Sequence, residues 1–367
     1  MKKILFFIHD LGHGGAEKVL VNLVNNMDPE KFHITVMALF GGGVNEQFLK
    51  PHIRYRTVFK KPFPGNSHLM KVFSPKLLHK WFIKERYDIE IAYLEGPDSR
   101  IISGCPDKDT RLVSWIHCTM KSAEDIARGF RSAKEAEDCY NRMDAIVFVS
   151  QATRDAFLSI CPYIGWTAVL YNTNESNKIQ DYAREPARLP EECFCWCGVG
   201  KVIPIKGFDR MIRIQKRLIE EGYKTHLCIL GEGSRKTELQ KLTAECGIAD
   251  SVTFLGYQTN PYKYVAKCDL FVCASHSEGF STAATEALIV GTPVCTVDVS
   301  GMKEMLGENN EWGIVTENDE DALYRGIKDL LDDPALLAHY KNQAAIRGKI
   351  FSTENTVHAV EEMLTVL

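Results

Sequence analysis

The chain has 367 residues, of which 45% are hydrophobic and 25% are charged, and its formal net charge is −4. This length suits two domains of ordinary size, and the composition excludes a disordered chain. The net charge excludes a protein that binds nucleic acid through an overall basic surface.

The first residues and the cysteines predict a cytoplasmic protein. Only five apolar residues, 4–8, precede His9 and Asp10, whereas a secretory signal needs about 7–15. Nowhere does an apolar run approach the ~18 residues of a membrane span. The twelve cysteines are scattered and lack the spacing of a disulfide scaffold or a zinc site. Cysteine stands at every second position of residues 193–197, and we interpret this segment as a strand. We therefore expect a reducing compartment.

Apolar runs and helical stretches alternate along the first half of the chain. Short runs predict buried strands over residues 4–8, 34–39, 89–94, 111–117, 145–149 and 167–170. Apolar residues at helical spacing predict an amphipathic helix over residues 16–27. This alternation is typical of parallel βαβ units in an α/β domain.

Residues 181–192 are rich in Pro, Arg and Glu and have no apolar period, so we interpret them as a linker. Beyond it the alternation restarts, with strands predicted over 194–199, 225–230, 251–255, 270–273 and 293–297 and helices over 208–221, 235–246, 282–290, 320–331, 334–351 and 354–367. We expect an N-terminal domain over 1–180 and a C-terminal domain over 193–348. Two doubly wound sheets joined in this way would face a central cleft at the carboxyl ends of their strands.

The most specific segment is residues 277–287, where a glycine loop precedes a predicted helix. Gly279 lets the backbone approach a ligand closely, and the amides at a helix start suit a phosphate or sugar hydroxyls. Glu278 lies in the loop and Glu286 about one turn inside the helix, so the two carboxylates can flank one ligand. Two solvated glutamates beside an ordinary turn are the alternative.

These residues belong to a series of segments that resembles glycosyltransferase family 4, the retaining enzymes of the GT-B fold. Residues 278–293 resemble the E-x7-E signature with its trailing G-x-P, and residues 198–209 resemble the donor-phosphate loop. Residues 230–233 and 254–257 follow in family order, and residues 9–17 resemble the first glycine loop. The resemblance spans nearly the whole chain, weakly over 40–110 and strongly over 195–315.

The resemblance implies a GT-B fold, in which two Rossmann-like doubly wound domains face a central cleft and a terminal helical segment, residues 349–367, returns to the N-terminal domain. It also implies an acceptor-binding N-terminal domain and a nucleotide-sugar-binding C-terminal domain. The expected reaction is transfer of a hexose-type sugar from a nucleotide sugar, a UDP-sugar in the first place, to a glycan or lipid-linked acceptor in surface polysaccharide synthesis.

Residue roles follow from the same resemblance. Glu286 would hold the donor ribose, Glu278 would face the donor sugar, and Gly256 and Tyr257 would bracket the base. The predicted donor-binding residues are Gly14, Gly15, Gly200, Lys201, Lys206, Gly231, Gly256, Tyr257, Glu278, Gly279, Phe280, Ser281, Thr282 and Glu286. The predicted catalytic residues are Lys206, Lys201, Glu278 and His117.

Lys201 and Lys206 suit the chemistry of sugar transfer. Breaking the bond between an anomeric carbon and a nucleoside diphosphate places negative charge on the leaving phosphate, and fixed cations lower that barrier. The family usually has arginine at position 201, and lysine keeps the charge but loses the two-point contact. A pair of solvated loop lysines is the alternative. No catalytic base is assigned, because the departing phosphate can itself take the acceptor proton.

The N-terminal half offers two weaker signals. The loop of residues 12–15 could present amides to the diphosphate, or it could be a plain tight turn. It does not fit a dinucleotide-binding motif, because Glu17 stands at the sixth position and no acidic residue ends the strand over 34–39. His117 ends a predicted strand where family members commonly contact the donor sugar. A structural histidine is the alternative.

No metal and no other cofactor is expected. Residues 319–321, Asp-Glu-Asp, resemble the metal-binding D-x-D of another glycosyltransferase class. We interpret them instead as the cap of the helix that follows.

Residues 50–86 contain ten basic residues and a single acidic one, a local net charge of +9. Aromatic and aliphatic residues, Trp81 and Phe82 among them, are interleaved with the lysines. A basic helix bearing aromatic residues is typical of a surface that docks on anionic lipid headgroups, here at the inner face of the plasma membrane. An amphipathic helix packed on the domain core and a site for a polyanionic glycan are the alternatives.

Two other functions stay open. One is a hydrolase or epimerase-like enzyme that acts on a nucleotide sugar without an acceptor. The other is a catalytically silent subunit that binds glycan or stabilises a complex. The intact Glu278, Glu286 and Lys206 count against a silent subunit, and the lysine at position 201 counts for it.

Overall fold

The computed structural model describes residues 1–12 and 14–367, and for residues 67–69 it describes the backbone alone. The chain forms two compact units, one of residues 1–174 with 353–367 and the other of residues 175–352. It passes into the second unit a few residues before the Pro- and Arg-rich stretch 181–192 and returns after Ser352.

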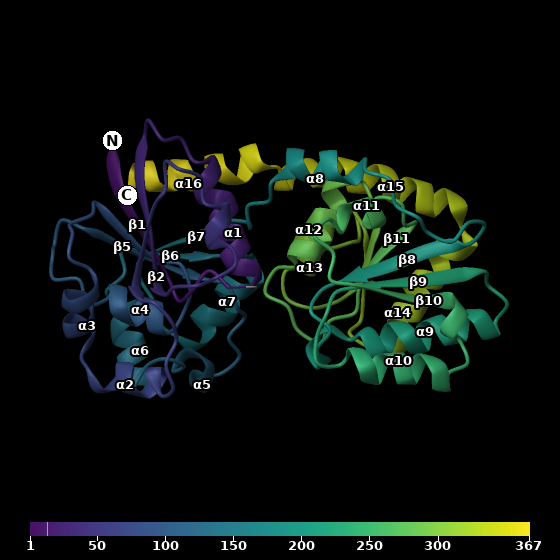
Figure 1. Ribbon diagram of the computed structural model, residues 1–367, viewed down its shortest axis with the longest axis horizontal. Helices are drawn as coiled ribbons and strands as arrows, with labels where there is room; N and C mark the ends of the chain where they lie inside the picture. The colour runs from purple at the N-terminus through teal and green to yellow at the C-terminus, as the bar shows by residue number, and fades with distance from the viewer. Residues whose placement is uncertain (13) are drawn as a thin grey trace. The chain divides into compact units, whose positions relative to one another are not determined.

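The first unit contains a seven-stranded parallel sheet in the order β3-β2-β1-β4-β5-β6-β7 (Figure 1). Its strands are β1 (Lys2–Ile8), β2 (Phe32–Phe40), β3 (Arg54–Phe59), β4 (Ile89–Ala92), β5 (Arg111–Ile116), β6 (Ala145–Phe148) and β7 (Trp166–Val169). The strand order reverses beside β1, which pairs with β2 on one side and β4 on the other. Ligands of open α/β sheets bind at the carboxyl edge of such a switch point.

Helices cover both faces of this sheet, with α1 and α16 on one side and α3, α4 and α6 on the other (Figure 1). The helices are α1 (Gly15–Asn26), α2 (Asn66–Val72), α3 (Pro75–Phe82), α4 (Pro97–Ile102), α5 (Ala123–Ile126), α6 (Ala133–Tyr140), α7 (Gln151–Ile160) and α16 (Thr353–Val366), with a short 3-10 helix η1 (Glu46–Phe48). Because both faces are covered, β1 is apolar without alternation, and its residues 4–8 are fully buried.

Helix α16 belongs to the first unit although it follows the whole of the second in sequence. Lys2 Nζ donates to the carbonyl oxygens of Leu364 and Thr365 at 2.9 and 2.8 Å. The backbone N–H of Asp28 donates to Glu361 at 2.6 Å. The expected return of the last helix to the N-terminal domain is therefore observed.

The second unit contains a six-stranded parallel sheet in the order β10-β9-β8-β11-β12-β13. Its strands are β8 (Phe194–Val199), β9 (Thr225–Leu230), β10 (Val252–Gly256), β11 (Leu270–Cys273), β12 (Val294–Val297) and β13 (Ile314–Thr316). Here the order reverses between β8 and β11, which pair directly. Two doubly wound parallel sheets confirm the predicted fold class.

The helices of the second unit alternate with these strands. They are α8 (Ser176–Ala183), α9 (Phe208–Glu220), α10 (Lys236–Glu245), α11 (Tyr262–Val265), α12 (Thr282–Ile289), α13 (Met302–Leu306), α14 (Glu320–Asp332) and α15 (Pro334–Arg347), with 3-10 helices η2 (Pro204–Lys206), η3 (Ala249–Ser251) and η4 (Gly348–Phe351). Among all the helices described in the two units, none has the length and apolar character that crossing a membrane requires.

Candidate functional site

An ion pair lies at the switch point of the second unit. Lys206 ends the 3-10 helix η2 after β8, and Glu278 lies in the loop after β11. Lys206 Nζ is 2.5 Å from Glu278 Oε1, and Ser275 Oγ donates to the same oxygen at 2.6 Å. The lysine side chain is 27% exposed and the glutamate side chain 10%. The fold thus holds a cation and a carboxylate, brought from separate loops, at the carboxyl edge of the sheet.

Gly207 fixes the position of the Lys206 loop. Its φ is +65°, and a Cβ there would lie 2.1 Å from the carbonyl oxygen of Ala274. The backbone N–H of His276 donates to the carbonyl oxygen of Ile205 at 2.7 Å. Because only glycine fits this contact, the loop docks directly on the residues that follow β11. A small cavity borders the ion pair, and its lining includes Val199, Phe208, Met211, Cys273, Ser275 and Ser281.

Glu286 lies on α12, and the residue is 9% exposed. The hydroxyl of Tyr262, on α11, donates to Glu286 Oε1 at 2.9 Å. Ser281 caps the same helix by accepting from the backbone N–H of Ala284 at 3.3 Å. Thr282 is the first residue of this helix, directly after the loop that carries Gly279. A buried carboxylate with a tyrosine partner and a capped helix start therefore adjoin the glycine loop.

Three of the predicted glycines meet at the carboxyl ends of neighbouring strands. The N–H of Gly231 donates to the carbonyl oxygen of Gly256 at 2.9 Å. A Cβ on Gly231 would lie 1.8 Å from the carbonyl oxygen of Gly200. A side chain is therefore excluded at Gly231, where β9 ends, and the backbones of Gly200, Gly231 and Gly256 lie close together at this edge of the site.

The remaining predicted donor-binding residues of this unit differ in setting. Tyr257 follows Gly256 and is 69% exposed. Phe280 is 6% exposed and packs against Phe351, with ring centroids 5.8 Å apart. The Lys201 side chain is exposed and forms no ion pair within the described residues. The structure thus brings Lys206 and Glu278 together and leaves Lys201 outside that pair.

In the first unit, His117 directly follows β5. Its backbone N–H donates to Glu95 at 2.9 Å, and its ring centroid lies 4.8 Å from that of Tyr93. Nε2 is buried and has no hydrogen-bond partner among residues 1–12 and 14–367. Burial lowers the pKa of His117 to about 3, so the imidazole is neutral near pH 7.

Sequence reasoning missed three polar side chains beside His117. The hydroxyl of Tyr93 and the indole Nε1 of Trp115 are buried, and the described part of the chain gives them no hydrogen-bond partner. Both carboxyl oxygens of Asp98 are buried as well, and the backbone of His9 interacts with this carboxyl group. Burial and the nearby charge of Glu95 raise the pKa of Asp98 well above its usual range. The only signal in the sequence was their place near the ends of predicted strands, Tyr93 and Trp115 within them and Asp98 just after one.

The predicted glycine loop of this unit opens α1 at Gly15. Gly14 is the N-cap residue and provides no side-chain cap, but the Glu17 carboxylate lies against it, because a Cβ on Gly14 would be 1.7 Å from Glu17 Oε2. Position 13 of the loop lies outside the described residues. A diphosphate at this helix start would have to displace a carboxylate.

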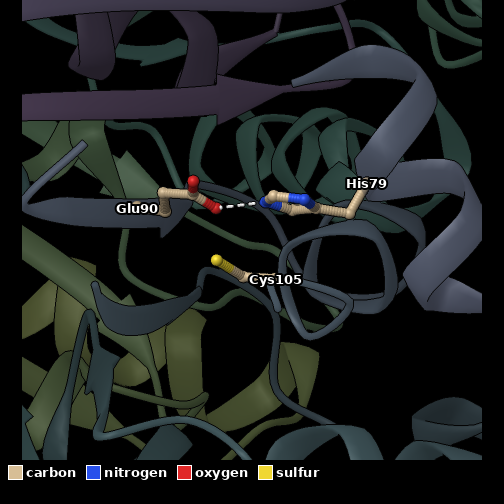
Figure 2. A group of neighbouring side chains, drawn as sticks. All are labelled: His79, Glu90 and Cys105. Carbon is tan, nitrogen blue, oxygen red and sulfur yellow. Dashed lines mark hydrogen bonds and ion pairs between the residues drawn. The ribbon is translucent and has the colours of Figure 1, made fainter. Parts of the chain in front are cut away.

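One group of buried side chains could hold a metal ion. His79 on α3, Glu90 on β4 and Cys105 after α4 point toward one another (Figure 2), with their donor atoms within 4.8 Å. His79 Nε2 is 2.7 Å from Glu90 Oε2. Burial lowers the pKa of His79, but the hydrogen bonds with Cys105 and Glu90 outweigh it and raise that pKa to about 9. An imidazolium–carboxylate hydrogen bond thus satisfies two of the three groups without an ion.

Asp319 caps α14, as predicted, by accepting from the backbone N–H of Ala322 at 2.8 Å. The D-x-D-like segment therefore has a structural role at this helix start.

The basic segment 50–86 is not one helix but the strand β3 followed by α2 and α3. Glu85 pairs with Arg54 and Arg56 at 2.7 and 2.8 Å, which neutralises part of the charge. Of the aromatic residues, Phe82 packs on Phe59 with ring centroids 5.7 Å apart, whereas Trp81 is 44% exposed. The segment therefore serves both the core and the surface.

Two family models match the chain in succession. The one described as Glycosyltransferase Family 4 matches residues 13–172, and the one described as Glycosyl transferases group 1 matches residues 180–347. These ranges cover nearly the whole chain, with the first unit under one model and the second under the other.

Two curated relatives are similar over most of their length. A Campylobacter jejuni N-acetylgalactosamine-N,N'-diacetylbacillosaminyl-diphospho-undecaprenol 4-alpha-N-acetylgalactosaminyltransferase is 31% identical over 364 residues, 96% of this chain and 96% of the relative. The lipopolysaccharide core biosynthesis glycosyltransferase LpsD of Rhizobium meliloti is 26% identical over 90% of this chain and 88% of its own.

Solved structures share the fold at low sequence identity. The HepE protein of Anabaena, in complex with UDP, has a TM-score of 0.78 at 20% identity and covers 100% of both chains. The lipopolysaccharide outer core galactosyltransferase WaaB has a TM-score of 0.75 at 17% identity, also over 100% of both chains.

Proposed function

The chain belongs to the group 1, family 4 glycosyltransferases, and from this premise we propose that it transfers a hexose-type sugar from a UDP-sugar to a lipid-linked glycan. The observation that carries the proposal is the pairing of Lys206 with Glu278 at the switch point of the second unit, beside the helix start that carries Glu286. These groups match the chemistry of a nucleoside diphosphate leaving an anomeric carbon.

Lys206 supplies the fixed positive charge. As the sugar–phosphate bond lengthens, negative charge grows on the diphosphate, and a cation held in place beforehand stabilises it without reorganisation. The 2.5 Å contact with Glu278 holds Lys206 at the carboxyl edge of the sheet before the donor arrives. Bound donor then shares that ammonium group, and the Glu278 carboxylate accepts hydrogen bonds from the hydroxyls of the sugar.

Glu286 holds the ribose of the donor. Its carboxylate is oriented by Tyr262, so it offers acceptor positions to a pair of vicinal hydroxyls at little entropic cost. UDP is the proposed nucleotide because HepE, which shares the fold, was solved with UDP and with UDP-glucose. The family retains the configuration of the transferred sugar, and the departing phosphate takes the acceptor proton.

The acceptor class is proposed from the names of relatives. The Campylobacter jejuni relative acts on a sugar linked through diphosphate to undecaprenol, and LpsD acts in lipopolysaccharide core synthesis. A lipid-linked glycan is therefore the first substrate to try.

Nucleotide binding tests the donor half of the proposal. We expect UDP at 100 times its dissociation constant to raise the free energy of unfolding by about 2.7 kcal/mol, measured by thermal shift against ADP, GDP and CDP. Incubation with a panel of UDP-sugars and an undecaprenyl-diphosphate-linked acceptor, followed by mass spectrometry, tests the transfer. UDP-sugar breakdown of equal rate without acceptor would indicate a hydrolase, and no stabilisation by any nucleotide would indicate a silent subunit.

We also propose that α3 and its neighbours dock on the anionic inner face of the plasma membrane, where a lipid-linked acceptor lies. Lys76, Lys80 and Lys84 are exposed, and the exposed Trp81 lies among them. Lys76, Lys80 and Trp81 lie on α3 and Lys84 lies just after it, and lysines with an interfacial aromatic residue are the groups that anionic lipid surfaces attract.

Cosedimentation with vesicles tests the docking. We expect binding to vesicles of phosphatidylglycerol and phosphatidylcholine at low salt, and loss of most of it in the K76E/K80E/K84E variant. The matched control is K224E/K341E, which reverses two exposed lysines of the second unit. Equal binding of both variants would reject the docking surface.

A further inference from the structure

Two donors share one oxygen of the Glu278 carboxylate. Lys206 Nζ lies 2.5 Å from Glu278 Oε1, and the hydroxyl of Ser275 donates to the same oxygen at 2.6 Å. The lysine belongs to η2, whereas the serine lies just after β11. The two donors differ in charge, so a diphosphate that enters the site attracts the ammonium group strongly and the hydroxyl only weakly.

The two donors also differ in how freely they can move. The Lys206 side chain is long and 27% exposed, so its ammonium group can turn toward a ligand. Ser275 is 2% exposed, and a single rotatable bond carries its hydroxyl oxygen. Both residues line the small cavity beside the ion pair. Ser275 therefore keeps its direction when the lysine changes its own.

Backbone contacts on either side fix the position of Ser275. A Cβ on Gly207 would lie 2.1 Å from the carbonyl oxygen of Ala274, the residue before the serine. The backbone N–H of His276, the residue after it, donates to the carbonyl oxygen of Ile205 at 2.7 Å. Because neither contact involves the ion pair, the serine stays in place whether or not the lysine remains bonded to the carboxylate.

A third group near this oxygen is too far away to replace the serine. The Sγ atom of Cys273 lies 3.9 Å from Glu278 Oε1 and 3.6 Å from Ser275 Oγ. A thiol is a weak donor, and at this distance it contributes little to a charged acceptor. Of these three donors, only Ser275 gives Glu278 a strong hydrogen bond for which a diphosphate does not compete.

Sugar transfer makes this distinction important. In the proposed function the donor diphosphate shares the ammonium group of Lys206, and this sharing grows as negative charge develops on the leaving phosphate. Glu278, whose side chain is 10% exposed, then loses part of the attraction that holds it, at the step in which it faces the sugar. A charged carboxylate that is largely buried needs a hydrogen bond that persists through this step.

We propose that Ser275 is a positioning residue: its hydroxyl holds the Glu278 carboxylate toward the donor sugar while Lys206 turns to the leaving diphosphate. The inference rests on the proposed function, which places that diphosphate at Lys206. Ser275 acts through Glu278, and its hydroxyl keeps its proton throughout the reaction. Its contribution is largest in the transition state, where the charge on the phosphate is greatest.

Removal of this hydroxyl should lower turnover and leave nucleotide binding unchanged. We expect Ser275→Ala to lower kcat about 10–100-fold, the effect of losing a hydrogen bond to a charged group. KM for the UDP-sugar and the dissociation constant of UDP should change less than about threefold, because the proposed function assigns the nucleotide to Glu286. Ser275→Thr keeps the hydroxyl and should recover most of kcat.

The kinetic constants come from the release of UDP by the full chain. The donors are a panel of UDP-sugars that includes UDP-glucose and UDP-N-acetylgalactosamine, with the undecaprenyl-diphosphate-linked acceptor. The matched control is Ser103→Ala in the first unit: Ser103 is 1% exposed, and its hydroxyl donates to the carbonyl oxygen of Arg100 at 2.8 Å. We expect this control to lower the melting temperature and to leave kcat unchanged.

A double-mutant cycle shows whether Ser275 acts through Glu278. In the Glu278→Gln background, Ser275→Ala should lower kcat less than about threefold, because the carboxylate that the serine positions is already absent. A serine that only stabilised the fold would lower kcat by the same factor in both backgrounds.

The inference would be overturned by a kcat of Ser275→Ala equal to that of the wild type, by an equal loss of kcat in Ser103→Ala, by a rise in KM in place of the fall in kcat, or by equal losses in the two backgrounds. A Ser275→Thr variant with the melting temperature of the wild type and the kcat of Ser275→Ala would also overturn it. If the wild type binds UDP and turns over a UDP-sugar while Ser275→Ala matches it, the inference alone fails. If the wild type neither binds UDP nor turns over any UDP-sugar, the proposed function fails, and the inference fails with it.

Discussion

Both units have a parallel sheet whose strand order reverses at a switch point, but the polar side chains at the two switch points differ in their hydrogen bonding. In the second unit the site groups are already paired, Lys206 with Glu278 and Ser275, and Glu286 with Tyr262. In the first unit, the hydroxyl of Tyr93 and Nε1 of Trp115 are enclosed without hydrogen-bond partners in the described chain. The paired groups of the second unit are thus held in position by their neighbours before a ligand arrives, whereas these groups of the first unit are held by burial alone.

The largest expected effect concerns the paired side. Lys206→Ala should lower the turnover of donor about 10²–10³-fold, because it removes a fixed charge aimed at the leaving phosphate. Lys201→Ala should lower it less than about tenfold, because that side chain lies outside the ion pair. The release of UDP, followed by a coupled assay, measures both. Equal losses in the two variants would mean that the pairing with Glu278 does not mark the catalytic lysine.

Donor affinity should show the next effect. Glu286→Gln should raise the dissociation constant of UDP about 10–30-fold, since the amide has one acceptor oxygen instead of two and no negative charge to strengthen the hydrogen bonds from the ribose hydroxyls. Tyr262→Phe should raise it only a few-fold, because it removes the orienting bond and leaves the carboxylate. Isothermal titration calorimetry measures these constants. UDP binding unchanged in Glu286→Gln would remove this carboxylate from the ribose site and weaken the contrast between the two edges.

The glycine that docks the Lys206 loop gives a smaller effect on stability. Gly207→Ala should lower the free energy of unfolding by about 2 kcal/mol, because its Cβ would lie 2.1 Å from a carbonyl oxygen and its φ is +65°. Gly222→Ala is the matched control: φ is +90° but no atom lies within 4 Å, so only backbone strain of about 1 kcal/mol applies. Urea unfolding measures the loss of stability in both variants. Equal losses would mean that the Lys206 loop moves aside to accommodate the added Cβ, so that its contact with Ala274 adds no strain.

Two histidines of the first unit sharpen the contrast between paired and unpaired groups. The pKa of His79, paired with Glu90, is raised to about 9, so its contribution to stability is complete below pH 6.5 and is lost as the pH rises through 9. The pKa of His117, whose Nε2 has no partner in the described chain, is lowered to about 3, so stability is lost as the pH falls from 6.5 toward 3.

From these pKa values, the full loss should be about 3 kcal/mol for His79 and about 5 kcal/mol for His117. Urea unfolding across pH 3–10 measures it, with the difference between the wild type and H79Q or H117Q isolating each histidine. If the difference in the free energy of unfolding between the wild type and H79Q does not shrink between pH 6.5 and 9, His79 is not paired with Glu90 in solution.

The sequence predicted the second unit well because its site is encoded in short segments. Residues 198–209 and 277–287 each carry strand, loop and helix start together, so spacing alone places Lys206 and Glu278 at strand ends. Tyr262 was missed because it reaches Glu286 only through the packing of α11 near α12, 24 residues away. Lys201 and Lys206 looked equivalent in the sequence. What distinguishes them is the docking of Gly207 on Ala274, a contact between residues far apart in the chain that spacing does not reveal.

The first unit was predicted less completely for a physical reason. Asp98 follows a proline in the first turn of a helix, where a solvated acid is ordinary, and only the strand order beside β1 encloses it. The basic segment 50–86 was expected to contain a basic helix bearing Trp81 and Phe82, and α3 (Pro75–Phe82) is such a helix, but β3 at residues 54–59 and the preceding helix α2 were not predicted. The charge and the aromatic content of the segment were recognised. That residues 54–59 form a strand was not, because this strand depends on pairing with β2.

The return of helix α16 to the first unit sets an order of events during synthesis. Lys2 and Asp28 bond to residues 361–365, which leave the ribosome only after all of residues 175–352 have been made. The unit whose sheet emerges first therefore cannot finish folding first, and it waits with one face of its sheet incompletely covered while the second unit folds as a continuous segment. A nascent chain of this protein would thus expose its first unit to chaperones longer than its second.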